Sequence, residues 1–271
     1  MRGSSRAAAS AVQQAFSAAL DQGADRSALG EELFAASAVI DASPSLRRAL
    51  ADPSREGQAK TALAQRIFGG RVSPTTAQLL GAVAGERWAE EGDLADTVES
   101  LAVQSILAKA EGEGRIDAVE DELFRFERIV AGDAGLRDTL SSRNTDAQGK
   151  SDLVAVLLAG KAQPETVRLA QQAVRTPRAR RLDRIMERYL ALAATRRDEL
   201  TAQVTVAAPL TEQQSARLRS ALEKHYGKPV KLQSVTDSTV IGGIRVQIGD
   251  EVVDGTVLRR LDEARRHLSG G

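Results

Sequence analysis

The sequence contains no cysteine, only two histidines and few aromatic residues, which make up 3% of its 271 positions. The lack of cysteine excludes disulfides, thiol nucleophiles and iron–sulfur clusters, and His225 and His267 are too few for most catalytic metal sites. The 37 basic residues are balanced by 37 acidic ones, whereas proteins that bind a nucleic-acid backbone usually carry an excess of base. We therefore expect a non-enzymatic protein without a cofactor, a metal or a nucleic-acid partner.

Long apolar runs are also missing. The longest, Leu153–Ala159, is far shorter than the roughly 20 residues that a membrane-spanning helix needs. The N-terminus has two arginines and no early acidic residue, but Ser4 or Ser5 is better placed to cap an amphipathic helix that continues to Leu20. We expect no direct insertion into a membrane and, if the protein works at one, a peripheral position.

Residues 1 to about 200 carry the spacing of an almost entirely helical region. Val12, Phe16 and Leu20 recur at intervals of four residues, which places them on one face of a helix. Prolines and glycines stand between such stretches, where they begin or end helices. The pattern predicts about ten or eleven helices, most of them 10 to 20 residues long.

An internal repeat is the most informative feature of this region. A shift of 90 residues aligns positions 31–80 with 121–170 without a gap, with thirteen identities. The identities include Gly70 with Gly160 and Pro74 with Pro164, residues that determine turn geometry rather than bulk. A tandem duplication of one helical module follows. We expect an extra N-terminal module over 1–94 and a second over 95–200, with the helix from about 93 to 112 closing the first and opening the second.

The residues from 201 onward have a different pattern. Alternating apolar residues predict strands at 203–206, near 230–232, and at 244–248 and 251–253, the last two forming a hairpin. Thr211 and Gln214 fit a capping box that begins a helix ending near Tyr226, and a last helix is expected after Asp254. The fold class is therefore mainly α, with tandem duplicated helical-bundle modules followed by a small C-terminal α/β domain over 201–271.

The segment IGGIRVQIGDEVVDGTVLRRLDEARRHL contains an ordered series of glycines and aspartates. This structural signature consists of Gly242, Gly243, Gly249, Asp250, Asp254 and Gly255. It resembles the C-terminal signature of the F-type ATP synthase delta subunit family, also known as the oligomycin-sensitivity-conferring protein family. The resemblance covers roughly residues 95–271, and the additional module resembles the long form found in actinobacteria. No helix like that of subunit b is visible, so we expect a delta chain that is not fused to subunit b.

The resemblance implies a structural role without catalysis. Members of this family form part of the peripheral stalk, or stator, and join the catalytic head of the ATP synthase to subunit b against the torque of the rotor. The implied partners are N-terminal helices of alpha subunits and the distal end of subunit b, at the cytoplasmic face of the cell membrane. We expect the module over 95–200 to bind the alpha subunits, and the role of the first module stays open.

Two groups of arginines are candidate partner-binding residues, either as contacts to an acidic partner helix or as a solvated face. They are Arg175, Arg178, Arg180, Arg181 and Arg184 in the first group, and Arg259, Arg260, Arg265 and Arg266 in the second.

Two other functions are alternatives to the stalk subunit. A helical-repeat adaptor for unrelated amphipathic helices would have no need of the C-terminal signature. An enzyme using Lys150 is disfavoured because Gly149-Lys150-Ser151 resembles the end of a phosphate-binding loop, yet Asn144 occupies the position where that loop requires glycine.

Overall fold

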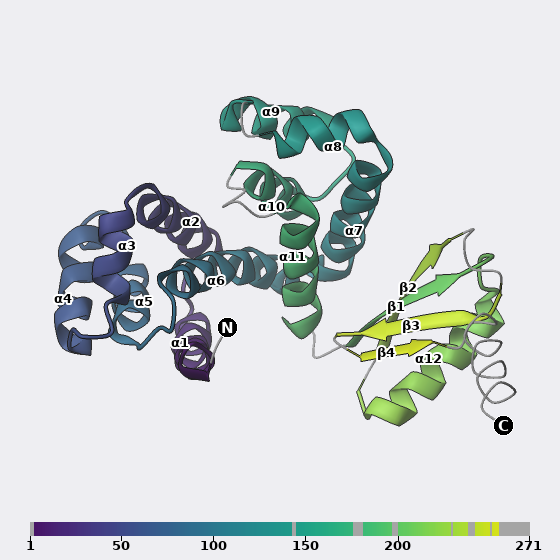
Figure 1. Ribbon diagram of the computed structural model, residues 1–271, viewed down its shortest axis with the longest axis horizontal. Coiled ribbons are helices and arrows are strands. Elements are labelled where there is room, and N and C mark those ends of the chain that lie inside the picture. The colour runs from purple at the N-terminus through teal and green to yellow at the C-terminus, as the bar shows by residue number, and fades with distance from the viewer. Residues whose placement is uncertain are drawn as a thin grey trace, which may run out of the picture. The chain divides into compact units, whose positions relative to one another are not determined.

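The computed structural model describes residues 3–142, 145–175, 181–196, 200–228, 230–237, 242–249 and 251–254. The chain divides into two compact units, Met1–Ala193 and Ala194–Gly271 (Figure 1). In its described residues the first unit is built from helices. They are α1 (Gly3–Asp21), α2 (Arg26–Ala42), α3 (Pro44–Ala51), α4 (Gly57–Phe68), α5 (Pro74–Gly85), α6 (Glu91–Gly112), α7 (Ile116–Gly132), α8 (Ala134–Ser141), α9 (Ala147–Leu158), α10 (Pro164–Arg175) and α11 (Leu182–Arg196).

The repeat seen in the sequence is also a repeat of helices. The bounds of α2, α3, α4 and α5, moved by 90 residues, are those of α7, α8, α9 and α10. The same shift moves α1 onto α6 and α6 onto the segment that contains α11. The predicted tandem duplication of a helical module is confirmed. We refer to α1–α6 as copy one and α6–α11 as copy two.

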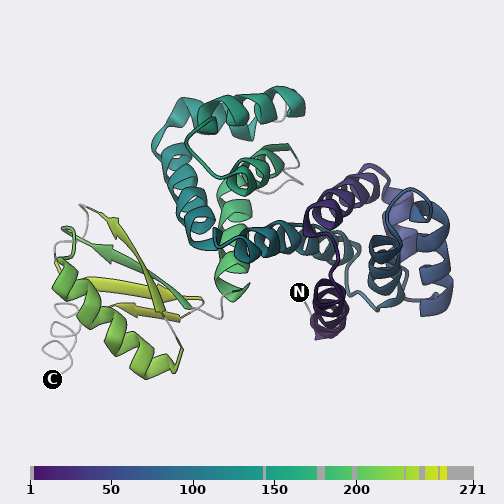
Figure 2. The ribbon, with the colours of Figure 1, turned by 180° about the vertical axis from the view of Figure 1, so that it is seen from behind.

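The central helix α6 belongs to both copies. In Figures 1 and 2 it runs from the helices of copy one to those of copy two. It has buried residues around most of its circumference, among them Leu94, Val98, Leu101 and Leu107, which is typical of a helix enclosed by others. The domain boundary that the sequence repeat predicts, between residues 94 and 95, lies inside this helix. It stays a prediction.

Local signals set the same boundaries in both copies. Ser43 and Asp133, at equivalent positions, each cap a short helix by accepting a hydrogen bond from the backbone N–H three residues on. Gly70 and Gly160 have φ angles of 73° and 67°, a conformation that glycine adopts without a steric penalty.

Polar contacts repeat as well. The carboxylate of Glu32 accepts hydrogen bonds from the backbone N–H of Ser73, at 2.9 Å, and from the hydroxyl of Thr76. In copy two, Glu122 accepts from the backbone N–H of Gln163 at 2.8 Å and from the hydroxyl of Thr166 at 2.5 Å. Each glutamate therefore satisfies donors at the start of the fifth helix of its copy.

The second unit is a four-stranded sheet with one described helix. Its elements are β1 (Leu200–Val206), α12 (Glu212–Tyr226), β2 (Val230–Thr236), β3 (Ile244–Ile248) and β4 (Glu251–Asp254). The strand order is β2-β1-β3-β4, with β1 parallel to β2 and antiparallel to β3. Thr211 and Gln214 form the predicted capping box. The expected last helix lies outside the described residues.

A small apolar core holds this unit together. Ala202, Val204 and Val206 of β1 are buried, and Leu218 and Leu222 of α12 pack against the strands. Among the described residues no helix is both long and apolar enough to cross a bilayer.

Candidate functional site: the equivalent grooves of the two copies

The first group of predicted arginines is only partly described. Arg175 donates a hydrogen bond to the side chain of Gln148. Arg181 and Arg184 form ion pairs of 2.8 Å with Asp183 and Glu187. Both arginines are well exposed, so these pairs contribute little to stability, and their role in binding a partner stays a prediction. Arg178, Arg180 and the whole second group, Arg259, Arg260, Arg265 and Arg266, lie outside the described residues.

The glycines of the C-terminal signature shape the β3–β4 region. Gly243 has a φ angle of 89° where the chain enters β3, and Gly249 has a φ angle of 57° in the hairpin turn, so both adopt conformations that favour glycine. Gly242 precedes this bend, and Asp254 is the last residue of β4. Asp250 and Gly255 lie outside the described residues.

A groove lies between α1 and α5 of copy one. Its volume is about 510 Å³. Small or uncharged side chains line it: Ala15, Ala18 and Ala19 of α1 and Thr75, Gln78, Leu79 and Ala82 of α5, with Gln22, Gly23 and Ala24, which follow α1, at one end. Ala15 and Ala18 are exposed. We call this surface the α1/α5 groove. Because short side chains allow close approach, a partner helix can lie along it with its own larger side chains inserted.

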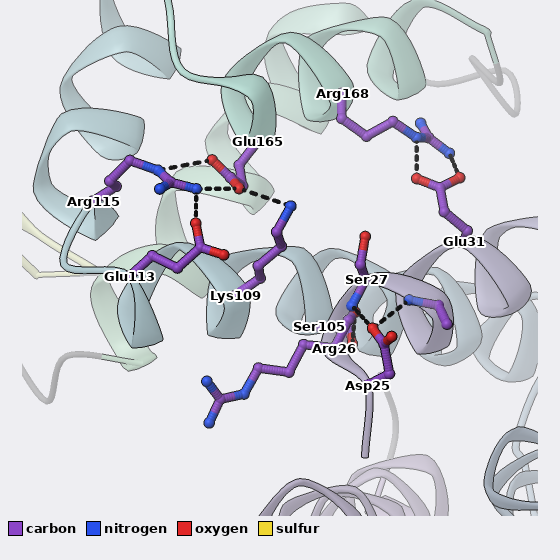
Figure 3. Close-up of polar contacts among 11 residues, drawn as sticks. Asp25, Arg26, Ser27, Glu31, Ser105, Lys109, Glu113, Arg115, Glu165 and Arg168 are labelled. Atoms are coloured by element: carbon purple, nitrogen blue, oxygen red, sulfur yellow. Dashed lines mark hydrogen bonds and ion pairs between the residues drawn. The ribbon is translucent and has the colours of Figure 1, made fainter. Parts of the chain in front are cut away.

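The equivalent surface of copy two lies between α6 and α10 and carries charged residues instead. The positions of Ala19, Thr75 and Gln78 are taken by Lys109, Glu165 and Arg168. The side chain of Glu165 is only 1% exposed and lies 3.3 Å from the ammonium of Lys109. It also accepts hydrogen bonds from Arg115 at 2.8 and 3.3 Å (Figure 3). These contacts bridge α6 and α10 where copy one has its groove.

The bridge also determines the charge of Glu165. Burial favours the neutral acid, but hydrogen bonds from Arg115, from its own backbone N–H and from Lys109 outweigh burial and lower the pKa of Glu165 below its ordinary value. The carboxylate is therefore a stable part of the folded molecule at neutral pH.

A second contact ties this surface to copy one. The guanidinium of Arg168 makes two bonds, of 2.6 and 2.8 Å, to the carboxylate of Glu31 on α2, and lies 4.5 Å from the ring centre of Phe34. The paired geometry is visible in Figure 3 and is the strong, bidentate form of an arginine–carboxylate interaction. Ser105 of α6 also donates to the backbone carbonyl of Arg26 at 2.8 Å, so α2 lies beside α6 at this point.

Lys150, the residue on which the enzyme alternative depends, contributes to helix packing. Lys150 is buried and its ammonium donates to the backbone carbonyl of Ser142 at 3.1 Å. Lys60, its counterpart in copy one, is also buried and donates to the carbonyl of Glu86 at 2.6 Å. Burial is the main cause that lowers the pKa of Lys60. Both lysines tie the fourth helix of their copy to a nearby loop.

No local motif in the sequence marks Lys109, Arg115, Glu165 or Arg168 as site residues. The usable signal was in the repeat alignment, where Lys109, Glu165 and Arg168 align with the uncharged residues Ala19, Thr75 and Gln78, and Arg115 aligns with the oppositely charged Asp25.

Comparisons with known proteins agree with the repeat. A family model described as "ATP synthase delta (OSCP) subunit" matches residues 9–103 and 103–268, two ranges that meet inside α6. A likeness to a chain in the cryo-EM structure of the Toxoplasma gondii mitochondrial ATP synthase hexamer has 20% identity and a TM-score of 0.41, over 61% of this chain and 94% of that one. This structural likeness is too weak to carry an argument.

Curated relatives match over their full length. The ATP synthase subunit delta of Kineococcus radiotolerans is 44% identical over 269 residues, which are 99% of this chain and 98% of the relative. That of Streptomyces griseus is 43% identical over 271 residues, covering 100% of both chains, and that of Streptomyces coelicolor is 43% identical over 99% of this chain and 98% of its own length. The chain therefore belongs to the ATP synthase delta (OSCP) subunit family.

Proposed function

We propose that this chain is a non-catalytic subunit of the peripheral stalk of an F-type ATP synthase, which joins the catalytic head to subunit b and holds the head against the torque of the rotor. Family membership over nearly the whole chain supports this role. The polar side chains described above are engaged in contacts that stabilise helices, as expected of a mechanical part. The proposed location is peripheral, at the cytoplasmic face of the cell membrane.

The head contact in this proposal is an N-terminal helix of an alpha subunit lying in the α1/α5 groove. The observation that carries it is the difference between the two copies: the groove is lined by alanines in copy one and bridged by Glu165 in copy two. Helix-in-groove binding needs apolar complementarity and no titratable group. The sequence led us to expect the module over 95–200 as the alpha-binding one, and the open groove supports copy one instead.

Titration calorimetry with a synthetic peptide of the alpha-subunit N-terminus and the full chain tests this contact. Ala18→Trp fills the groove from an exposed position, so we expect the affinity to fall by about tenfold or more, because a blocked pocket removes the anchor of the interface. Ser17→Trp adds the same bulk to an exposed neighbour outside the groove lining and should leave binding unchanged. Equal effects of the two substitutions would contradict the assignment of this groove.

Co-purification tests the wider role. The chain should be recovered together with alpha subunits and subunit b from gently solubilised membranes. Recovery of the intact complex without this chain would exclude a stalk function.

A further inference from the structure

Copy two has a groove of its own at a different place, between α7, α8 and α11. Its volume is about 540 Å³. Its apolar lining consists of the buried residues Phe126, Val130 and Met186. Two arginines also line it: Arg137, which belongs to α8, and Arg181, which directly precedes α11. We call this surface the α7/α8/α11 groove.

Glu127 places a carboxylate in this groove, beside the apolar side chains. Glu127 is half-buried, and no hydrogen bond or ion pair joins it to another residue in the described part of the chain. Burial, Glu187 and Asp183 raise the pKa of Glu127, and Arg128 opposes them. Unlike Glu127, the acids that face it are paired, Asp183 with Arg181 and Glu187 with Arg184.

The corresponding helices of copy one carry a different set of charges. There the third helix is tied to the last by an ion pair of 3.4 Å between Arg47 and Glu91. The equivalent residues in copy two are Arg137 and Arg181, two cations that cannot pair with each other.

The carboxylate itself is a second difference between the copies. The position of Glu127 is occupied in copy one by Ser37, which is only 3% exposed. Copy two thus lacks the ion pair between its third and last helices and carries an acidic group where copy one has a serine.

We propose that the α7/α8/α11 groove binds an amphipathic helix of another subunit, which places apolar side chains on Phe126, Val130 and Met186 and a lysine or arginine beside Glu127. A buried or half-buried carboxylate is costly until a cation pairs with it, so the partner's basic residue satisfies a carboxylate for which the described residues provide no ion pair. This site is separate from the α1/α5 groove and does not depend on what that groove binds.

Photo-crosslinking in the assembled ATP synthase identifies the occupant. A benzophenone side chain introduced at Ser141, an exposed residue that lines the groove, should crosslink to one helical segment of another subunit that carries a lysine or arginine. The crosslink should persist with Ala18→Trp, since that substitution blocks only the other groove. No crosslink to another subunit, or one to a segment without a basic residue, would overturn the proposal.

The charge contact is then tested with a synthetic peptide of the crosslinked segment and the full chain. Glu127→Gln should weaken binding by about tenfold. Asp121→Asn, which neutralises an exposed carboxylate of the same helix, should leave binding unchanged. Glu127→Lys should abolish binding of the native peptide, and a peptide with its basic residue replaced by glutamate should restore it. Equal effects of Glu127→Gln and Asp121→Asn, or no rescue by the exchanged charge, would overturn it.

Discussion

Copy one and copy two of the helical module share their framework and differ in their surfaces. Both have the same helix bounds, the same glutamate at the start of the fifth helix and the same buried lysine in the fourth. Their grooves differ because charges have replaced small residues at a few positions, as at Thr75 and Glu165. Duplication has preserved what folds the module and altered what a partner can reach.

The largest expected effect concerns the shared core. Leu33→Ala and Leu123→Ala remove equivalent leucines that are 0% exposed, so each should lower the free energy of unfolding by about 2–5 kcal/mol. Because α6 belongs to both copies, each substitution should shift one common helical transition in thermal unfolding followed by circular dichroism. Two separate helical transitions, with only one shifted by each substitution, would show that the copies unfold independently. Val39→Ala, at an exposed position, is the control.

Glu165→Gln breaks the bridge that distinguishes copy two. The amide cannot form the ion pairs with Arg115 and Lys109, so we expect a loss of about 1.5–3 kcal/mol in urea unfolding. Glu113→Gln removes a more exposed carboxylate that also pairs with Arg115 and should cost well under about 1 kcal/mol. Similar losses for both would mean that the buried bridge is no more important than a surface pair.

The same bridge predicts a pH dependence. Because the pKa of Glu165 is lowered on folding from its ordinary value of 4.5, its contribution is fully present above that value and is lost as the pH falls through the folded pKa. The difference in unfolding free energy between the wild type and Glu165→Gln should therefore be constant near neutral pH and shrink below pH 4.5. A difference that grows on acidification would contradict the direction of the shift.

The close approach of α4 and α5 in copy one predicts a smaller effect on the free energy of unfolding, and one that differs between the two copies. A Cβ added at Gly57 would lie 2.7 Å from the backbone oxygen of Gly85, whereas copy two already has Ala147 at the equivalent position. Gly57→Ala should destabilise the chain by about 1–3 kcal/mol through overpacking. Ala147→Gly should cost about 1 kcal/mol or less, from helix propensity alone. A stabilising Gly57→Ala, measured by urea unfolding, would show that α4 and α5 can separate without cost.

The smallest expected effect is that of the tie between the copies. Arg168→Ala removes the pair with Glu31, whose side chain is 51% exposed, so the loss should be about 0.2–1 kcal/mol, with a further small part from the contact with Phe34. The matched control Arg125→Ala removes the fully surface pair with Asp121. If both substitutions leave the chemical-denaturation midpoint unchanged, the tie positions the helices without stabilising them.

Much of the fold could be predicted because its signals are local. The position of Thr211 three residues before Gln214 predicted the capping box, and the proline and glycine pairs of the repeat predicted where the fifth helix of each copy begins and the fourth ends. The family resemblance of the C-terminal signature was also recognisable in the sequence, and family membership replaces the adaptor alternative.

The candidate grooves could not be predicted in the same way. Arg168 and Glu31 are 137 positions apart in the chain. No periodicity or motif around either residue predicts that the two are in contact. The expectation that copy two binds the alpha subunits rests on its place next to the C-terminal unit in the sequence and stays a prediction, whereas the side chains that bridge its groove come from helices far apart in the chain.

The sequence by itself determined the duplicated module, the boundaries of its helices and the family, because caps, turns and apolar spacing act over a few residues. Only the tertiary structure decided which equivalent surface is open. Whether a groove is open depends on where long charged side chains such as Lys109, Glu165 and Arg168 meet, and that meeting place is set by the packing of α2, α6 and α10 rather than by any local pattern.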